Sequence, residues 1–406
     1  MNFKKDLPLT SSHWGTYRAK VKDGKVKELI GWENDKDPSP IGQGIVDVHN
    51  HQTRIDSPMI RKSWMDKGPG SNNSLRGTDP FISISWDEAE KIVSNELNRV
   101  KNDFGNASIF GGSYGWASAG RFHHAQSQLH RFLNCIGGYT RSKFTYSFAA
   151  AEAMVPHILG SYRAYLDTCT SWESIEENTE LFICFGGVPL KNGQIAQGGT
   201  GSHKQKEKLI RSANAGIKFV NFSPLKSDLL DEVNGEWLAL RPNTDVAIML
   251  GLAHTLYKEK LYDDKFIEKY TEGFDTFLPY LQGDIDGIVK DANWASSISE
   301  IPSEKIISLA KEMSSKRTMI SVSWSLTRQD HGEQPFWAAI MLASMVGQIG
   351  LPGGGFGFGY SATNHIGGQF SIIPGAAFPQ TQNKIEDFIP VARISDLLLN
   401  PGGSFD

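Results

Sequence analysis

Two serines in small-residue segments are the first candidates for chemistry. Ser113 stands in the run Gly-Gly-Ser-Tyr-Gly at 111–115, which fits the Gly-x-Ser-x-Gly turn that exposes a serine nucleophile between a strand and a helix. That turn predicts an α/β hydrolase only if a later histidine and carboxylate complete a triad, and no local motif selects a histidine after position 115. The alternative is a glycine turn that lets the backbone approach a ligand closely.

Ser147 is the second candidate. It precedes Phe148 and three alanines at 149–151. A hydroxyl at the start of such a segment is typical of a helix N-cap, where its oxygen accepts hydrogen bonds from free backbone amides. The local sequence therefore predicts a helix that starts at Ser147, and it gives this serine no catalytic role.

Alternating strand and helix patterns between 180 and 325 predict the domain that would position a ligand. The expected strands are 181–185, 217–222 and 318–322, and the expected helices are 204–212, 245–258 and 303–313. This order predicts a doubly wound α/β domain with a mostly parallel sheet. Such sheets bind ligands beyond the carboxyl ends of their strands. The loops expected there are 186–192, 223–226 and 323–328.

The patterns outside this domain are less regular. Residues 14–60 are rich in Gly, Asp and Pro, which predicts a small irregular or β-containing segment. Ser85 and Glu88 have the spacing of a capping box and predict the start of a long helix. The run 350–359 alternates Phe with Gly, and its glycines predict a break in regular structure.

The composition argues against several classes of protein. The 41 basic and 45 acidic residues give a net charge of −4 with no dense block of like charge, so no nucleic-acid surface is expected. The three cysteines include no Cys-x-x-Cys pair, which argues against an iron–sulfur cluster. No apolar run approaches ~18 residues, so no membrane span is expected. The N-terminus has no signal-peptide pattern, which predicts a cytoplasmic location, or a periplasmic one if the start is misplaced.

A set of ordered motifs resembles the molybdenum enzymes that reduce dimethyl sulfoxide, trimethylamine N-oxide and biotin sulfoxide. The motifs are Ser-Ile-Phe-Gly-Gly-Ser-Tyr-Gly-Trp at 108–116, Gly-Arg-Phe-His-His-Ala-Gln at 120–126, Tyr-Ser at 146–147, Thr-Asp-Val-Ala-Ile-Met-Leu-Gly at 244–251, His-Gly-Glu-Gln at 331–334 and Gly-Gln-Ile-Gly-Leu-Pro-Gly-Gly-Gly-Phe at 347–356. The resemblance runs through the whole chain. It implies the multidomain molybdopterin oxidoreductase fold with the C-terminal half absent.

This fold implies four parts of the chain. They are an N-terminal β or irregular segment at 1–57, the first part of an α/β domain that carries the molybdenum ligand at 58–162, a doubly wound cofactor-binding domain at 163–360, and a truncated return segment at 361–406.

The resemblance also implies a molybdenum bis(molybdopterin guanine dinucleotide) cofactor without an iron–sulfur cluster. Ser147 would be the protein oxygen ligand of the metal, and Tyr114 and Trp116 would lie over it as further catalytic residues. The cofactor contacts would be Trp116, Ser147, Lys191, Asn192, Ser223, Asp245, Trp324, Arg328 and His331. One departure concerns the family's Asp-Pro-x-Arg loop, which is Ser-Pro-Leu-Lys at 223–226, so a carboxylate and a guanidinium are both replaced.

The implied activity is removal of an oxygen atom from a small S-oxide or N-oxide by transfer to molybdenum. Tyr114 favours S-oxides, because trimethylamine N-oxide reductases tend to lack this tyrosine. Electrons would come from a separate donor protein or reductant, since the chain has no haem, cysteine-cluster or flavin motif. Two alternatives are an inactive truncated relative and an α/β hydrolase that uses Ser113.

Overall fold

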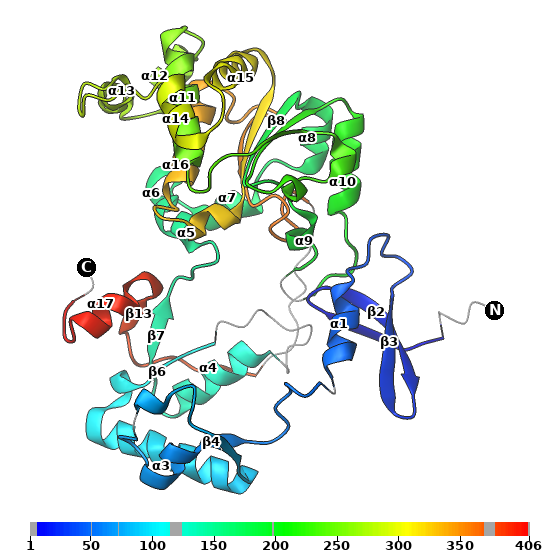
Figure 1. Ribbon diagram of the computed structural model, residues 1–406, viewed down its shortest axis with the longest axis vertical. Coiled ribbons are helices and arrows are strands. Elements are labelled where there is room, and N and C mark those ends of the chain that lie inside the picture. Colours follow the sequence, from blue (N-terminus) through cyan, green and yellow to red (C-terminus); the bar gives the residue numbers. More distant parts are fainter. Residues whose placement is uncertain are drawn as a thin grey trace.

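The upper part of the molecule in Figure 1 is built around a five-stranded sheet. Its strands are β8 (Leu181–Phe185), β9 (Lys218–Phe222), β10 (Glu236–Leu238), β11 (Thr318–Val322) and β12 (Gly355–Phe358). The strand order is β10-β9-β8-β11-β12, and all neighbours are parallel. The expected doubly wound domain is therefore confirmed, with the direction of winding reversed between β8 and β11. This computed structural model describes residues 6–49, 51–71, 73–113, 124–196, 199–368 and 378–404.

Helices cover both faces of this sheet. The helices on one face include α11 (Asp245–Lys258), α14 (Ala292–Ser299), α15 (Ser303–Ser315) and α16 (Gln334–Met345), and those on the other include α8 (Trp172–Asn178) and α10 (Gln205–Asn214). Because successive strand residues point to opposite faces, Ile183 packs in the first core and Phe182 in the second. Burial on both sides explains why the strands are continuous apolar runs rather than alternating ones.

The expected break at 350–359 is wrong, because part of this run forms β12. Phe356 and Phe358 point into the core beneath α16. On the opposite side, a Cβ at Gly357 would collide with the ring of Tyr360. Glycine at position 357 therefore allows close packing within a buried strand. The expectation that glycines interrupt regular structure does not take such packing into account.

A small antiparallel sheet forms the N-terminal segment, as expected. Its strands are β1 (Leu9–Ser12), β2 (Gly15–Lys22) and β3 (Lys25–Gly31), and α1 (Ile41–Val48) follows them. Figure 1 places this segment at the lower right, below α9 of the α/β domain.

The lower lobe combines distant parts of the chain. A parallel sheet joins β6 (Phe110–Gly111), β7 (Thr140–Lys143) and β13 (Phe388–Pro390), so a late segment returns to pair with an early one. The lobe also contains β4 (Met59–Arg61), β5 (Phe81–Ser83), α3 (Trp86–Phe104) and α4 (Ala125–Cys135). The expected helix start after Ser85 is confirmed, since Glu88 N donates to Ser85 Oγ at 3.2 Å. The division of the chain into four parts, with boundaries after residues 57, 162 and 360, stays a prediction.

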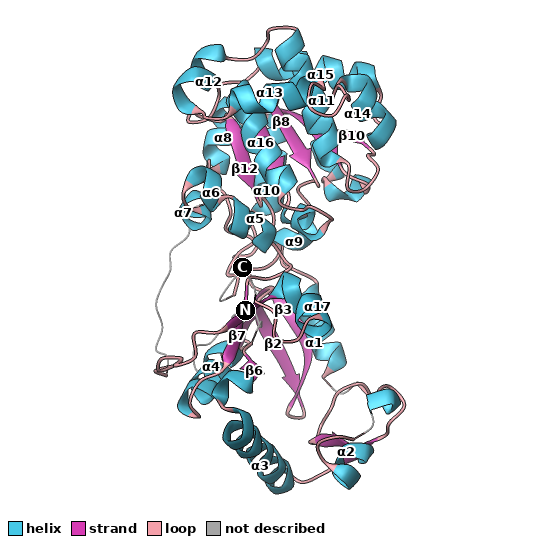
Figure 2. Ribbon diagram, turned by 90° about the vertical axis from the view of Figure 1, so that its left-hand side faces the viewer, coloured by secondary structure: helices cyan, strands magenta, loops and turns pink. Residues whose placement is uncertain are grey.

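The remaining helices are short. They are α2 (Lys62–Lys67), α5 (Ala149–Met154), α6 (Pro156–Leu159), α7 (Tyr162–Asp167), α9 (Leu190–Gly193), α12 (Asp264–Tyr270), α13 (Phe274–Gln282) and α17 (Ile394–Leu399). Figure 2 shows α2 and α3 at the opposite end of the long axis from the α/β domain. Within the described ranges, no helix combines the length and the apolar character needed to cross a bilayer.

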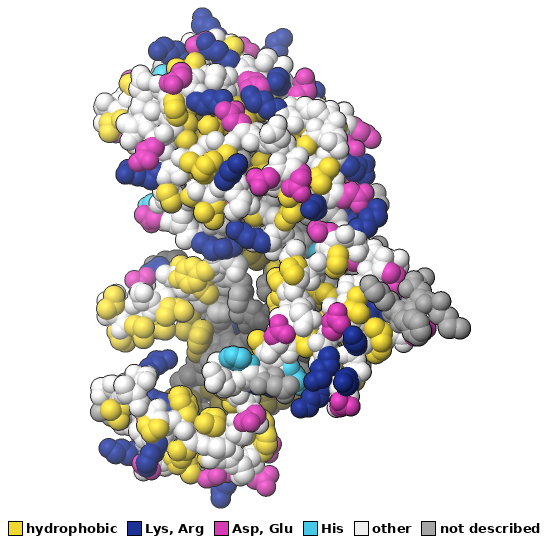
Figure 3. Space-filling model, turned by 45° about the vertical axis from the view of Figure 1, so that its right-hand side comes forward, with side chains coloured by type: hydrophobic (Ala, Val, Ile, Leu, Met, Phe, Trp, Pro, Cys, Tyr) yellow, Lys and Arg dark blue, Asp and Glu magenta, His cyan; other side chains and the backbone are white. Residues whose placement is uncertain are grey.

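Apolar side chains are more exposed in the lower lobe than a packed domain would leave them. The whole of α3 contains no buried residue, and Trp86 and Phe104 at its two ends are exposed. Figure 3 shows yellow side chains gathered on the lower left of the face in view, whereas charged side chains are spread over the α/β domain. The core of this lobe is small, with Ile109, Leu133 and Tyr139 as its buried members.

Candidate functional site

The carboxyl ends of three adjacent parallel strands define the candidate site. The loops 186–192, 223–226 and 323–328 follow β8, β9 and β11 directly, and these strands are neighbours in the order β9-β8-β11. The winding reverses between β8 and β11, so the loops after these two strands run to opposite sides of the sheet. That reversal opens the crevice in which doubly wound domains bind their ligands.

Ser147 lies against the loop that follows β11. Its carbonyl oxygen accepts hydrogen bonds from Thr327 Oγ1 at 3.2 Å and from Arg328 Nε at 3.3 Å. The neighbouring Phe148 stacks on Trp324 with ring centroids 4.7 Å apart. The tertiary structure thus brings the Ser147 turn together with Trp324 and Arg328, which were predicted for the same site from a distant part of the chain.

The expected role of Ser147 as the helix N-cap is wrong. Helix α5 begins at Ala149, and its N-cap residue is Phe148, with φ −159° and ψ 2° and no capping hydrogen bond from a side chain. Ser147 belongs instead to the turn that packs against the 323–328 loop. A tertiary contact, rather than local capping, fixes this turn.

A cavity of about 530 Å³ adjoins the Ser147 turn. Three segments line it, and they include Lys143, Thr145, Tyr146, His157, Gln329, Asp330, His331, Glu333, Pro390 and Val391. Tyr146 closes one side by donating a hydrogen bond from its hydroxyl to Val391 O at 2.6 Å. Thr145 Oγ1 is buried and has no partner among the described residues. Buried hydroxyls are normally satisfied, so a polar ligand in this cavity would complete the hydrogen bonding of Thr145.

Asp245 is a buried carboxyl near the same loops. It is the first residue of α11 and is only 4% exposed. Burial raises the pKa of Asp245 to about 6, while hydrogen bonds from its own backbone amide and from the Gln329 side chain oppose this rise. A carboxyl that is kept in a desolvated position beside a ligand crevice is typical of a functional site.

His331 is exposed and lies at the edge of the cavity. Its backbone has a φ of 50°, in the left-handed region that non-glycine residues seldom adopt, and its ring lies 3.5 Å from a carboxylate oxygen of Glu333. Strained backbone of this kind is concentrated at functional loops. His331 thus combines an unusual backbone conformation with a place in the lining of the cavity.

Lys191 and Ser223 both contact Asp228, a residue that the sequence did not single out. Lys191 Nζ lies 3.0 Å from Asp228 Oδ1, and Ser223 Oγ donates to Asp228 Oδ2 at 2.7 Å. The carboxylate joins the loops after β8 and β9. Asn192 is half-buried on α9, beside Lys191. No local motif marks Asp228, because its partners are 5 and 37 residues away.

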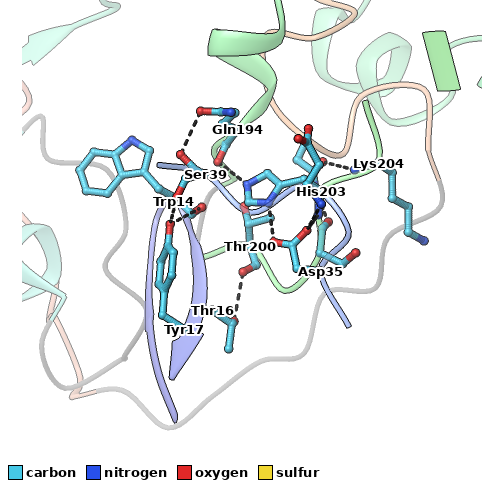
Figure 4. Close-up of polar contacts among 12 residues, drawn as sticks. Trp14, Thr16, Tyr17, Asp35, Ser39, Gln194, Thr200, His203 and Lys204 are labelled. Carbon is cyan, nitrogen blue, oxygen red and sulfur yellow. Dashed lines mark hydrogen bonds and ion pairs between the residues drawn. The ribbon is translucent and has the colours of Figure 1, made fainter. Parts of the chain in front are cut away.

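The N-terminal segment holds the chain just after α9. His203 Nδ1 lies 2.7 Å from Asp35 Oδ2, and His203 Nε2 lies 2.8 Å from the carbonyl oxygen of Gln194, as Figure 4 shows. Both ring nitrogens of His203 therefore have an oxygen atom within hydrogen-bond distance. Ser39 Oγ also donates to Gln194 Oε1 at 2.9 Å. These contacts anchor the segment that carries Lys191 and Asn192.

Two of the predicted catalytic residues lie outside the described part of the chain, namely Tyr114 and Trp116. The preceding Ser113 is described and follows β6, which has only two residues. The next described helix, α4, begins at Ala125, after the gap.

Comparison with models of protein families identifies the family of this chain. The family model for the molybdopterin oxidoreductase N-terminal domain matches residues 10–48, and the model for molybdopterin oxidoreductase matches residues 54–398. The chain belongs to the molybdopterin oxidoreductase family. The predicted fold class and the resemblance are thereby confirmed, and the family implies a molybdenum–pterin cofactor. The α/β hydrolase alternative finds no support.

Individual relatives agree with this assignment. The chain is 44% identical over 372 residues to a biotin sulfoxide reductase of Cereibacter sphaeroides. The aligned region covers 92% of this chain and 50% of that protein. It is 40% identical over 410 residues to a dimethyl sulfoxide/trimethylamine N-oxide reductase of Rhodobacter capsulatus, with 98% and 49% coverage. A trimethylamine-N-oxide reductase of Haemophilus influenzae is 38% identical, with 97% and 49% coverage. The chain thus spans about half the length of the curated relatives it matches.

A solved structure shares the fold at low sequence identity. Acetylene hydratase from Pelobacter acetylenicus aligns with a TM-score of 0.53 and 19% identity, over 83% of this chain and 43% of that chain. This likeness concerns the fold alone.

Proposed function

We propose that this chain provides the cofactor-binding half of a molybdenum-dependent reductase that removes an oxygen atom from S-oxides or N-oxides. The observation that carries the proposal is the contact between Ser147 and the 323–328 loop, since it sets the proposed metal-ligand turn at the carboxyl edge of the sheet. The names of the relatives supply the substrate class, which includes biotin sulfoxide, dimethyl sulfoxide and trimethylamine N-oxide.

We propose the bis(molybdopterin guanine dinucleotide) form of the cofactor. Arg328 uses Nε for Ser147 and makes no other hydrogen bond with the described residues, so its two terminal nitrogens suit a phosphate. Lys191 and Asn192 would contact a second phosphate-bearing group from the loop after β8, and Asp245 would accept hydrogen bonds from guanine. His331 and Trp324 would complete the walls of the cofactor site. When bound, this group supplies the two-electron chemistry of oxygen-atom transfer.

The chain's own residues would bind and orient the reactants. Ser147 would offer its hydroxyl oxygen as the protein ligand of the metal, and Tyr114 and Trp116 would shape the substrate pocket. A hydrogen bond from the Tyr114 phenol would orient the oxide oxygen of the substrate, and we propose a preference for S-oxides on this basis. A separate protein or small reductant would deliver the electrons.

The first test measures cofactor content and turnover together. The chain is produced in a host that makes molybdopterin guanine dinucleotide, and molybdenum is measured by mass spectrometry alongside pterin fluorescence and released GMP. Reduction of dimethyl sulfoxide and trimethylamine N-oxide is followed with a reduced viologen dye. The same assays on the longest reading frame that contains this chain distinguish an active enzyme from an inactive relative. Loss of both cofactor and turnover in both proteins would contradict the proposal.

A further inference from the structure

The carboxylate of Asp228 bridges two loops at the carboxyl edge of the sheet. One oxygen faces Lys191 Nζ at 3.0 Å, from the loop after β8, and the other accepts a hydrogen bond from Ser223 Oγ at 2.7 Å, at the end of β9. Ser223 Oγ in turn accepts a hydrogen bond from Leu225 N at 3.2 Å. The side chain of Asp228 is only 14% exposed, so the carboxylate itself is largely withdrawn from solvent.

The backbone around Asp228 reinforces this bridge. Val188 N donates to Asp228 O at 2.7 Å, which ties the two loops together a second time. Gly187 has a φ of 73°, and a Cβ built on it would lie 2.6 Å from the Cβ of Asp228. Only glycine permits so close an approach with this backbone conformation. Asp228 is therefore fixed by its main chain as well as by its side chain.

The bridge leaves Lys191 available to a ligand. The lysine side chain is 62% exposed, although its ammonium group is held by Asp228. An ammonium has three N–H donors, and Asp228 engages one of them. The remaining two can face a phosphate, and the carboxylate fixes where they lie. A tethered lysine loses less side-chain entropy when it binds than a free one.

We propose that Asp228 is a positioning residue for a nucleoside diphosphate group at this edge, acting through Lys191 and Ser223. It supplies, five residues later in the chain, the carboxylate that is missing from the Ser-Pro-Leu-Lys loop at 223–226. The inference rests on the proposed function, and it explains how the loop can keep a carboxylate after the replacement at position 223. The competing interpretation is that Asp228 merely neutralises Lys191.

The test uses GDP as the probe and the full chain purified without cofactor. Binding of GDP is measured by titration calorimetry for the wild type, Asp228→Ala, Asp228→Asn and Lys191→Ala. We expect Asp228→Ala to weaken GDP binding about tenfold, the scale on which supporting residues act. In the Lys191→Ala background, Asp228→Ala should weaken GDP binding less than it does in the wild type, because the part of its effect that passes through the lysine is already lost.

Control variants separate positioning from folding. Asp228→Asn keeps the volume and an acceptor for Ser223, so it should fold like the wild type and lose only the charge that holds Lys191. Asp231→Asn, on the exposed turn three residues further along, should bind GDP like the wild type. The melting temperature without GDP reports folding in each case.

The outcomes separate the two proposals. Wild-type affinity in both Asp228 variants, or tighter binding through relief of the charge on Lys191, would overturn the positioning role and leave the proposed function intact. A wild-type chain that binds neither GDP nor pterin would overturn both.

Discussion

The carbonyl oxygen of Ser147 accepts a hydrogen bond from Arg328 Nε at 3.3 Å, across 181 residues of sequence. Thr327 Oγ1 donates to the same oxygen at 3.2 Å. The contact uses the main chain of Ser147, so its side chain can be altered without removing the contact. The proposed role of the Ser147 hydroxyl and the structural role of its carbonyl can therefore be tested separately.

Substitution Ser147→Ala should remove activity and leave the fold in place. We expect turnover of dimethyl sulfoxide in the full reading frame to fall by at least about 100-fold, because loss of the proposed metal ligand should exceed the effect of losing a supporting group. The free energy of unfolding should change by less than about 1 kcal/mol, since the carbonyl contacts remain. Viologen-linked assays and chemical denaturation measure the two quantities. Ser142→Ala on exposed β7 is the control, and equal turnover in both variants would contradict the role of Ser147.

Substitution Arg328→Lys should reduce cofactor retention. Arginine can donate from Nε to Ser147 and at the same time offer its two terminal nitrogens to a phosphate. Lysine keeps the charge but has only one nitrogen for both partners. We expect several-fold less pterin per chain and a stability loss of about 1 kcal/mol, the usual contribution of one hydrogen bond. Arg241→Lys, on an exposed ion pair elsewhere in the α/β domain, should retain wild-type pterin content. Unchanged pterin in Arg328→Lys would argue that this contact is only structural.

Asp245→Asn should stabilise the cofactor-free chain in a way that depends on pH. Burial raises the folded-state pKa of Asp245 from 3.8 to about 6. The folded state therefore holds the proton more tightly, so the wild type is most stable below about pH 4 and loses stability as the pH rises to 6. At pH 7 the variant should gain about 2–3 kcal/mol, from a shift of about two units. Denaturation at pH 4 and at pH 7 measures this. An equal gain at both values would show that ionisation is not the cause.

Asp35→Asn should loosen the attachment of the N-terminal segment. Asp35 and His203 are both buried and lie within hydrogen-bond distance of each other, and leaving a buried polar group without its partner costs about 1–3 kcal/mol. We expect faster proteolysis around 194–204 and lower stability, with Lys36→Ala as an exposed neighbouring control. A double variant with His203→Gln measures the coupling between the two side chains. Additive losses would show that the pair does not act as a unit.

The sequence determined the α/β domain to a large extent. The bounds of β8, α11 and β11 are those expected, because buried parallel strands are short continuous apolar runs and α11 is a long uninterrupted one. The strand–helix order then dictates which ends of the strands meet, so the three loops of the candidate site were predictable. The motifs around Ser147, Asp245 and His331 were sufficient to indicate the family.

Contacts between distant residues decided the rest. The Phe/Gly run at 355–358 becomes a strand because β11 offers it an edge and Tyr360 needs the space beside Gly357, and neither condition is visible locally. Ser147 is not the N-cap residue of α5, because Thr327 and Arg328 donate hydrogen bonds to its carbonyl oxygen and fix the turn. Asp228 joins Lys191 to Ser223 only once the loops after β8 and β9 lie side by side. Local patterns fix which elements form, whereas the partners of polar groups depend on the packing of those elements against one another.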